Sequence, residues 1–129
     1  MEAKQRWGHW GQPTAVRKAR WLSVMRWRRS VQRVLRPYKL SFTQWLVLDA
    51  TQHVRVEKGD AVSQSDVGAH LGLSRATVSD AMCVLANEGL VDRGPDIHMP
   101  AWRIIMTDKG RDLLHRVGLG IDAVSRLED

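Results

Sequence analysis

Apolar residues recur at intervals of three and four between Thr14 and Arg36. This spacing places them on one face of an α-helix. Pro37 ends the pattern, because a proline cannot continue a helix. The chain therefore predicts a long amphipathic helix over residues 14–36, preceded by an irregular arm over residues 1–12. The apolar positions of this helix are Val16, Val24, Trp27, Val31, Val34 and Leu35.

A capping box predicts the start of a second helix. Ser41 and Gln44 have the spacing at which each side chain satisfies the backbone amide of the other. Apolar residues then follow at helical spacing, so we expect a helix over residues 42–53. Residues 53–60 are charged and are expected to form a loop, with a short strand at residues 61–62.

Residues 63–88 predict two helices separated by a tight turn. Ser63 and Asp66 repeat the capping-box spacing and open a helix over residues 63–71. Gly72 marks the turn, and a second serine cap begins a helix over residues 74–88 that ends at a glycine. Two helices joined in this way are typical of a helix-turn-helix.

A β-hairpin and a last helix complete the pattern. Residues 90–91 are apolar, as are all of residues 102–106 except Arg103, and a turn-forming stretch lies between them, so we expect a hairpin over residues 90–106. A final helix is expected from Thr107. Gly118 and Gly120 are expected to break it, leaving a short helical piece at residues 121–127.

The charge of the chain is concentrated near its amino end. Residues 1–39 contain 11 Lys and Arg and one acidic residue, whereas residues 40–129 contain 9 Lys and Arg and 13 acidic residues. The net charge is +6 and the sequence pI is about 10.2. A basic balance favours a polyanionic partner, with nucleic acid first and an anionic membrane second.

The compartment is expected to be the cytoplasm. Cys83 is the only cysteine, so no disulfide can form within the chain, which suits a reducing environment. No apolar run reaches the length of about 20 residues that crosses a bilayer, and the first residues have no apolar core of a signal peptide.

The start of the second helix of the helix-turn-helix carries the functional argument. Such a helix enters the major groove, where each base pair presents a distinct pattern of donors and acceptors. Arg75 has the geometry for a bidentate contact with guanine, and nearby hydroxyls suit phosphates or bases. The expected DNA contacts of this helix are Ser74, Arg75, Thr77 and Ser79.

In this order and spacing, the motifs resemble the MarR family of bacterial winged-helix regulators, over about residues 38–117. The matching segments are Leu40–Trp45, Ser63–Val67, Leu71–Ser79, Leu85, Gly89–Arg93 and Thr107–Gly110. The resemblance implies a mainly α winged helix-turn-helix with a small antiparallel β-hairpin wing. It also implies homodimerisation through N- and C-terminal helices, and transcriptional repression relieved by a small ligand, often an aromatic acid. Gln64 and Ser65 are further expected DNA contacts.

The resemblance predicts one domain over residues 1–129. Residues 14–36 and 107–129 are the expected dimerisation helices, and residues 41–106 the expected winged helix-turn-helix, with the wing at about residues 90–106. A homodimer predicts a pseudo-palindromic operator in double-stranded DNA.

The wing departs from the family pattern. Family members place an arginine near the tip of the wing, where it enters the minor groove, but residues 96–101 contain no arginine. Arg93, His98 and Arg103 are the candidates to replace it. The missing arginine leaves an alternative function open, in which a degenerate winged helix binds a protein partner instead of DNA.

Other residues have both a structural and a functional interpretation. Trp27, Tyr38 and Trp45 either pack in the core or line an aromatic ligand pocket. The basic run at residues 26–36 is either a solvated helix face or a surface that binds phosphates or an anionic ligand. The five histidines show no metal-ligand spacing and no catalytic motif is present, so we expect no metal, no cofactor and no enzymatic activity.

Overall fold

The computed structural model describes residues 14–96 and 99–128. Its elements are α2 (Ala15–Leu35), a 3-10 turn η1 (Arg36–Tyr38), α3 (Phe42–Lys58), β1 (Val62–Ser63), α4 (Gln64–Leu71), α5 (Arg75–Asn87), β2 (Val91–Asp96), β3 (Met99–Met106) and α6 (Asp108–Glu128). The protein is mainly helical with one small antiparallel sheet, which confirms the winged-helix class predicted from the sequence. None of the described helices is both long enough and apolar enough to span a membrane.

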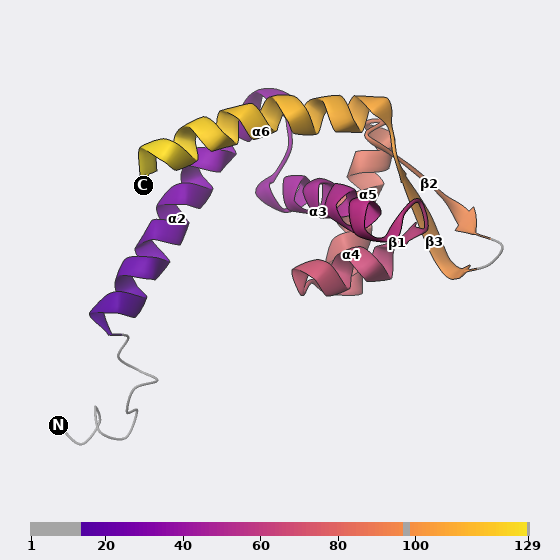
Figure 1. Cartoon of the computed structure of the whole chain (residues 1–129), viewed down its shortest axis with the longest axis horizontal. Coiled ribbons are helices and arrows are strands. Elements are labelled where there is room, and N and C mark those ends of the chain that lie inside the picture. The colour runs from indigo at the N-terminus through magenta and orange to yellow at the C-terminus, as the bar shows by residue number, and fades with distance from the viewer. Residues whose placement is uncertain (1–13, 97–98, 129) are drawn as a thin grey trace, which may run out of the picture.

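Helix α6 connects two parts of the molecule. Figure 1 shows α6 across the top of the view, with α2 under its carboxyl end and the winged helix under its amino end. The hairpin of β2 and β3 projects from the side of the winged helix away from α2. The long helices thus lie along one side of the helix-turn-helix, and the hairpin lies on the other.

Side-chain caps begin the helices where the sequence predicts them. Ser41 Oγ accepts from the amide of Gln44, and Gln44 Oε1 accepts from the amide of Ser41, both at 3.0 Å. Ser63 and Asp66 form the second box, with both bonds at 3.1 Å. These bonds satisfy amides that lack a partner within the helix, so they fix the first turns of α3 and α4.

The sheet places the hairpin against the helix-turn-helix. The strand order is β1-β3-β2, and all pairs are antiparallel. Val62 of β1 and Arg93 of β2 both pair with Ile104 of β3, and the ladder of β2 and β3 becomes irregular between Pro95 and Asp96. The hairpin base is thus part of a three-stranded sheet, and only its outer part projects.

One core joins the helices to the sheet. Its central side chains come from α3, α5 and the strands, and α2 and α6 close it on one side. The largest fully buried residues are Leu35, Leu48, Met82, Leu85, Leu90 and Ile104. Burial of these side chains from several elements holds the helix-turn-helix in place.

The predicted loop over residues 53–60 is wrong for its first part, because α3 continues to Lys58. Val54 is buried and extends the apolar face of α3 by one more turn. The charged side chains that suggested a loop lie on the outer side. Gly59, with a φ of 83°, ends the helix.

The predicted break in the last helix is also wrong, because α6 runs through Gly118 and Gly120 to Glu128. A Cβ atom at Gly120 would lie 2.8 Å from Cγ1 of Val34 in α2. Gly120 therefore marks a close approach of α2 and α6. Packing against α2 outweighs the low helix propensity of glycine.

Candidate nucleic-acid interface

A tight turn sets the angle between α4 and α5. Gly72 adopts the left-handed conformation with a φ of 69°, and the amide of Leu73 donates to the carbonyl of Gly68 at 3.0 Å. A Cβ atom at Gly68 would lie 3.3 Å from the carbonyl oxygen of Leu73 and 3.5 Å from Cγ2 of Val78. Two glycines therefore allow the helices to approach closely at this turn.

Helix α5 presents its amino terminus to solvent. Ser74 Oγ accepts from the amide of Thr77 at 3.2 Å and lies 2.9 Å from Oγ1 of Thr77. Ser74 and Thr77 are thus joined in the cap. The amino end of the helix carries partial positive charge, which favours a phosphate in front of it.

Arg75 follows this cap and is exposed. In residues 14–96 and 99–128, no ion pair or hydrogen bond engages its guanidinium group. Ser79, one turn later, is half-exposed. The buried residues Val78, Ala81, Met82 and Leu85 hold the opposite face of α5 against the core. This packing orients Arg75 and Ser79 outward on a fixed helix.

The two DNA contacts predicted in α4 differ in their exposure to solvent. Ser65 is exposed, whereas Gln64 is half-buried. The Oε1 atom of Gln64 is buried and receives no hydrogen bond from the described residues. Ser65 is therefore accessible to a phosphate, and Gln64 lies mainly at the edge of the core.

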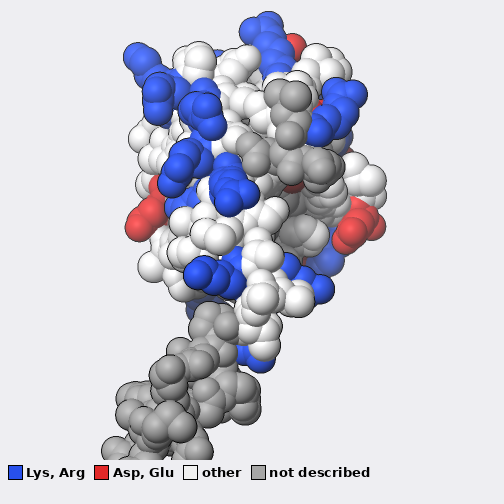
Figure 2. Space-filling model, turned by 90° about the vertical axis from the view of Figure 1, so that its left-hand side faces the viewer, with Lys and Arg blue, Asp and Glu red and all other residues white. Residues whose placement is uncertain are grey.

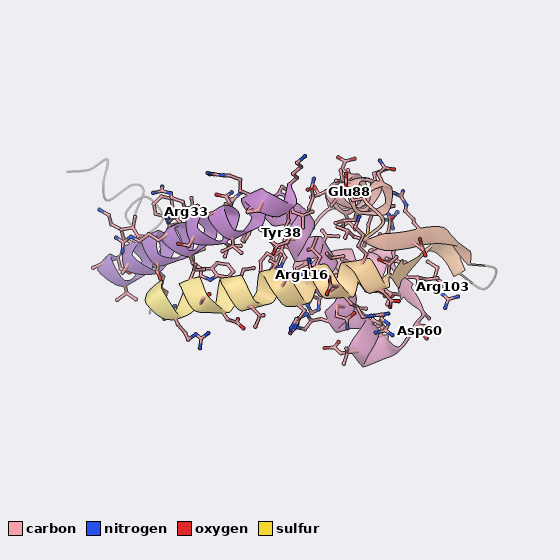
Figure 3. All side chains as sticks on the ribbon, turned by 90° about the horizontal axis from the view of Figure 1, so that it is seen from above. Arg33, Tyr38, Asp60, Glu88, Arg103 and Arg116 are labelled. Carbon is pink, nitrogen blue, oxygen red and sulfur yellow. The ribbon has the colours of Figure 1, made fainter. Side chains whose placement is uncertain are left out.

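The base of the wing is held by two arginines. Arg93 in β2 donates from its guanidinium group to Sγ of Cys83 in α5 at 3.4 Å. Arg103 in β3 donates from Nε to the carbonyl oxygen of Asp60 at 3.3 Å. Figure 3 shows Arg103 and Asp60 near each other at the base of the hairpin. The sequence did not indicate that Cys83 contacts the wing. The third wing candidate, His98, lies outside the described residues.

The residues predicted to line an aromatic pocket lie in or beside a packed cluster. Trp27 and Trp45 approach each other edge-on with ring centroids 6.3 Å apart, and Phe42 contacts both rings. The indole Nε1 of Trp27 donates to Ser125 Oγ in α6 at 2.6 Å. Tyr38 is half-buried against the core. The cluster links α2, α3 and α6, and a ligand role for its members stays a prediction.

A groove lies beside this cluster, between α2 and the first turn of α3, and shares Phe42 with it. Its volume is about 600 Å³, and its lining combines Arg28, Gln32 and Arg36 with residues 39–44. The guanidinium group of Arg28 lies 5.2 Å from the centroid of the Phe42 ring. The basic run in the sequence pointed to Arg28 and Arg36. Lys39 was missed, because it follows the basic run and joins the lining only through the turn that its left-handed φ of 56° makes in the chain.

Two carboxylates have shifted pKa values. The Lys58 ammonium group donates to Asp66 at 2.9 Å, and with the hydrogen bonds from Ser63 it lowers the pKa of Asp66 despite partial burial. Burial raises the pKa of Asp49, against the opposing effect of His53 and His70. The two imidazole rings stack at 6.3 Å. Within the described part of the chain, no three histidine, cysteine or acidic side chains are grouped to hold a metal.

Basic residues dominate the end of the molecule formed by α2. Figure 2 shows Lys and Arg side chains over much of this face, with acidic side chains mainly at its edges. Helix α2 contains seven Lys and Arg and no acidic residue. This charge lies on the long helix, away from α4 and α5, so the attraction for an anion is not confined to α5.

The sequence was compared with protein families and with curated proteins. The sequence model of the MarR family matches residues 38–98. This segment begins just before α3 and includes α3, β1, α4, α5 and β2. No curated protein matches the sequence.

Solved structures share the fold. A MarR-family transcriptional regulator from Rhodococcus sp. RHA1 is 23% identical with a TM-score of 0.70, covering 87% of this chain and 79% of that one. CouR from Rhodococcus jostii RHA1, bound to p-coumaroyl-CoA, is 26% identical with a TM-score of 0.63, covering 75% and 66%. BpsR from Bordetella bronchiseptica, whose DNA binding is regulated by 6-hydroxynicotinic acid, is 20% identical with a TM-score of 0.72, covering 90% and 79%.

Proposed function

We propose that this protein is a transcriptional regulator that binds duplex DNA sequence-specifically, because residues 38–98 match the sequence model of the MarR family. The fold is that of MarR-family transcriptional regulators. The observation that carries the proposal is the amino end of α5, where a serine cap is followed by the exposed, unengaged Arg75. A helix presented in this way suits insertion into the major groove.

In the proposed complex, each part of the surface has its own role. Arg75 contacts a base edge, with guanine as the favoured partner because it offers two acceptors. Ser65 and Ser79 contact phosphates or bases from the exposed sides of α4 and α5. Arg93 and Arg103 orient the wing through their contacts with Cys83 and Asp60.

The regulator is proposed to act as a homodimer. Helix α2 exposes apolar side chains that the described residues of a single copy leave uncovered. They are Val16, Trp21, Val24 and Met25, and α6 adds Leu119. Burial of this surface against a second copy removes apolar area from water. A two-fold dimer would place the two α5 helices in successive major grooves and recognise a pseudo-palindromic operator.

Repression relieved by a small ligand is the proposed mode of regulation. CouR binds p-coumaroyl-CoA, and 6-hydroxynicotinic acid regulates the DNA binding of BpsR. Both small molecules contain an aromatic ring. In this chain, Trp27 and Trp45 lie where the long helices α2 and α6 meet the winged helix. A ligand bound there would change the position of the winged helix relative to the long helices.

A second candidate function is protein binding by a winged helix that no longer binds DNA. The wing segment without arginine favours it, because a contact expected in the minor groove is missing. The exposed apolar side chains of α2 would then meet a different protein. The intact cap and exposed Arg75 favour DNA binding over this alternative.

The test is DNA binding by Arg75→Ala, measured at fixed salt by fluorescence anisotropy. The first DNA to use is the region upstream of the protein's own gene. The substitution is expected to weaken operator binding by about 1–3 kcal/mol and binding to unrelated DNA by less. Arg116→Ala is the control, because it also removes one exposed arginine, from α6. Absence of specific binding by the unaltered protein would favour the protein-binding alternative.

A further inference from the structure

We propose that the groove between α2 and α3 is a binding site for a small molecule bearing a phosphate group. Arg28 and Arg36, together with Lys39, place three cationic side chains along its lining. None of the described residues that line the groove is acidic. The sequence contains no acidic residue between Glu2 and Asp49, so the stretch of chain that forms the groove contributes no negative side chain.

The two arginines are fixed on one side of the groove by helix geometry. Arg28, Gln32 and Arg36 are spaced by four residues, which places them above one another on α2 and its continuation η1. The side chain of Arg28 lies over the ring of Phe42 at 5.2 Å, which limits its freedom before a ligand binds. A planar guanidinium group held in this way suits a bidentate contact with a phosphate.

The other side of the groove adds complementary donors. Lys39 adopts the left-handed conformation and so turns the chain between η1 and α3. In the first turn of α3, Ser41 caps the amide of Gln44, and the amide of Trp45 donates to the carbonyl of Ser41. The amides of Phe42 and Thr43 precede these bonds and face the amino end of the helix. The groove thus combines cationic side chains from α2, η1 and Lys39 with backbone amide donors at the start of α3.

Charge, size and shape together favour a phosphate ester over a simple carboxylate. A volume of about 600 Å³ is within the range of sites that hold small molecules. Three cations exceed the charge of a single carboxylate, whereas a phosphate monoester carries close to two negative charges. The buried Leu40 in the lining offers an apolar contact for the rest of the ligand.

Inorganic pyrophosphate is the probe for the first experiment, by isothermal titration calorimetry on the full chain without DNA. We expect saturable binding, and benzoate is expected to bind at least about tenfold more weakly. Arg28→Gln combined with Arg36→Gln should raise the Kd for pyrophosphate at least about tenfold. The matched control is Arg26→Gln combined with Arg33→Gln, which removes the same charge from α2 at positions outside the groove and should leave the Kd within about twofold of the unaltered protein.

A further variant covers the case in which the double substitution unfolds the helix. Lys39→Asn removes the charge, and asparagine tolerates the left-handed conformation. This variant should weaken pyrophosphate binding about threefold or more. Equal weakening in the groove variants and the control would show general attraction to a basic surface and would overturn the proposal, as would the absence of saturable binding.

DNA is the other source of phosphate groups, and a separate measurement distinguishes it. If the groove contacts the DNA backbone instead, the groove double variant should reduce the slope of log affinity against log salt by about two, while pyrophosphate would not bind saturably. That combination overturns the small-molecule proposal. Because pyrophosphate binding is measured without DNA, its outcome is independent of the Arg75 test.

Discussion

Gly120 of α6 lies against Val34 of α2, so closely that a Cβ atom on the glycine would be 2.8 Å from the valine Cγ1. Gly118, two residues earlier in the same helix, has open space where its Cβ would be. The two glycines share a helix but have opposite environments. A substitution at Gly118 therefore tests helix propensity alone, whereas the same substitution at Gly120 also tests packing against α2.

This pair gives the first prediction. Gly118→Ala should raise the free energy of unfolding by about 0.5–1 kcal/mol, because alanine is the better helix former. Gly120→Ala should lower it by about 1 kcal/mol or more, because overpacking against Val34 outweighs that gain. Urea denaturation of both variants measures the difference. Equal effects would show that α2 and α6 do not approach closely at Gly120.

The second prediction concerns acid stability at the start of α4. The Lys58 ammonium group and the cap at Ser63 hold the pKa of Asp66 below its ordinary value of 3.8. The stabilisation by Asp66 is therefore complete above its unfolded-state pKa and is lost as the pH falls through the lower folded-state value. Asp66→Ala should cost about 0.5–2 kcal/mol at pH 7 and much less at the lowest pH at which the protein folds.

Lys58→Met is the control for this assignment. It keeps the capping box and removes the hydrogen bond that contributes most to the lowered pKa of Asp66. The acid loss of stability should then be smaller and should be complete at a higher pH than in the unaltered protein, because the folded-state pKa of Asp66 moves toward its unfolded-state value. Denaturation curves recorded between pH 7 and the acid limit test this. An unchanged pH dependence would mean that the ion pair contributes nothing in solution.

The third prediction concerns assembly. Val24 is 59% exposed on α2, and Val56 is 74% exposed on α3. Val24→Arg should weaken the proposed dimer by about 2 kcal/mol or more, because it places a charge in an apolar contact. Val56→Arg makes the same change away from α2 and should leave the dimer intact. Light scattering over a range of concentrations measures both. A monomeric unaltered protein would contradict the proposed assembly.

The fourth prediction concerns the wing. His98 is proposed to replace the arginine that family members place in the minor groove. An ordinary histidine gains its proton near pH 6.5, so operator affinity should rise as the pH falls from about 7.5 to about 6. The salt slope should steepen by about one unit. His98→Ala should remove this pH dependence while keeping most of the affinity. Identical pH profiles for the two proteins would exclude the role.

Local signals predicted most of the fold. The capping boxes at Ser41 and Ser63 and the turn at Gly72 depend on neighbours within a few residues, and all three are confirmed. The errors came from distant contacts. Val54 keeps α3 helical by reaching the core, and Val34 accommodates Gly120 from a helix more than 80 residues away.

The candidate site was predictable to a smaller extent. Arg75 and its serine cap follow from a local motif, and the structure places Arg75 at the surface as such a motif requires. The contact of Arg93 with Cys83 joins a strand to a helix, and no spacing in the sequence indicates it. The groove likewise depends on how α2 meets α3, since its lining residues come from both sides of the turn at Lys39.

Helix α6 is tightly packed at two points along one uninterrupted rod. Near its start, a Cβ atom at Gly110 would collide with the carbonyl oxygen of Leu90, and near its end Gly120 lies against Val34. A helix of 21 residues is about 31 Å long. A tilt of about 5° at one end of such a rod displaces the other by about 3 Å. A small change where α2 crosses α6 would therefore tilt α6 as a rigid body and move the winged helix at its other end. In a dimer, this tilt would change the distance between the two α5 helices without any change inside the winged helix.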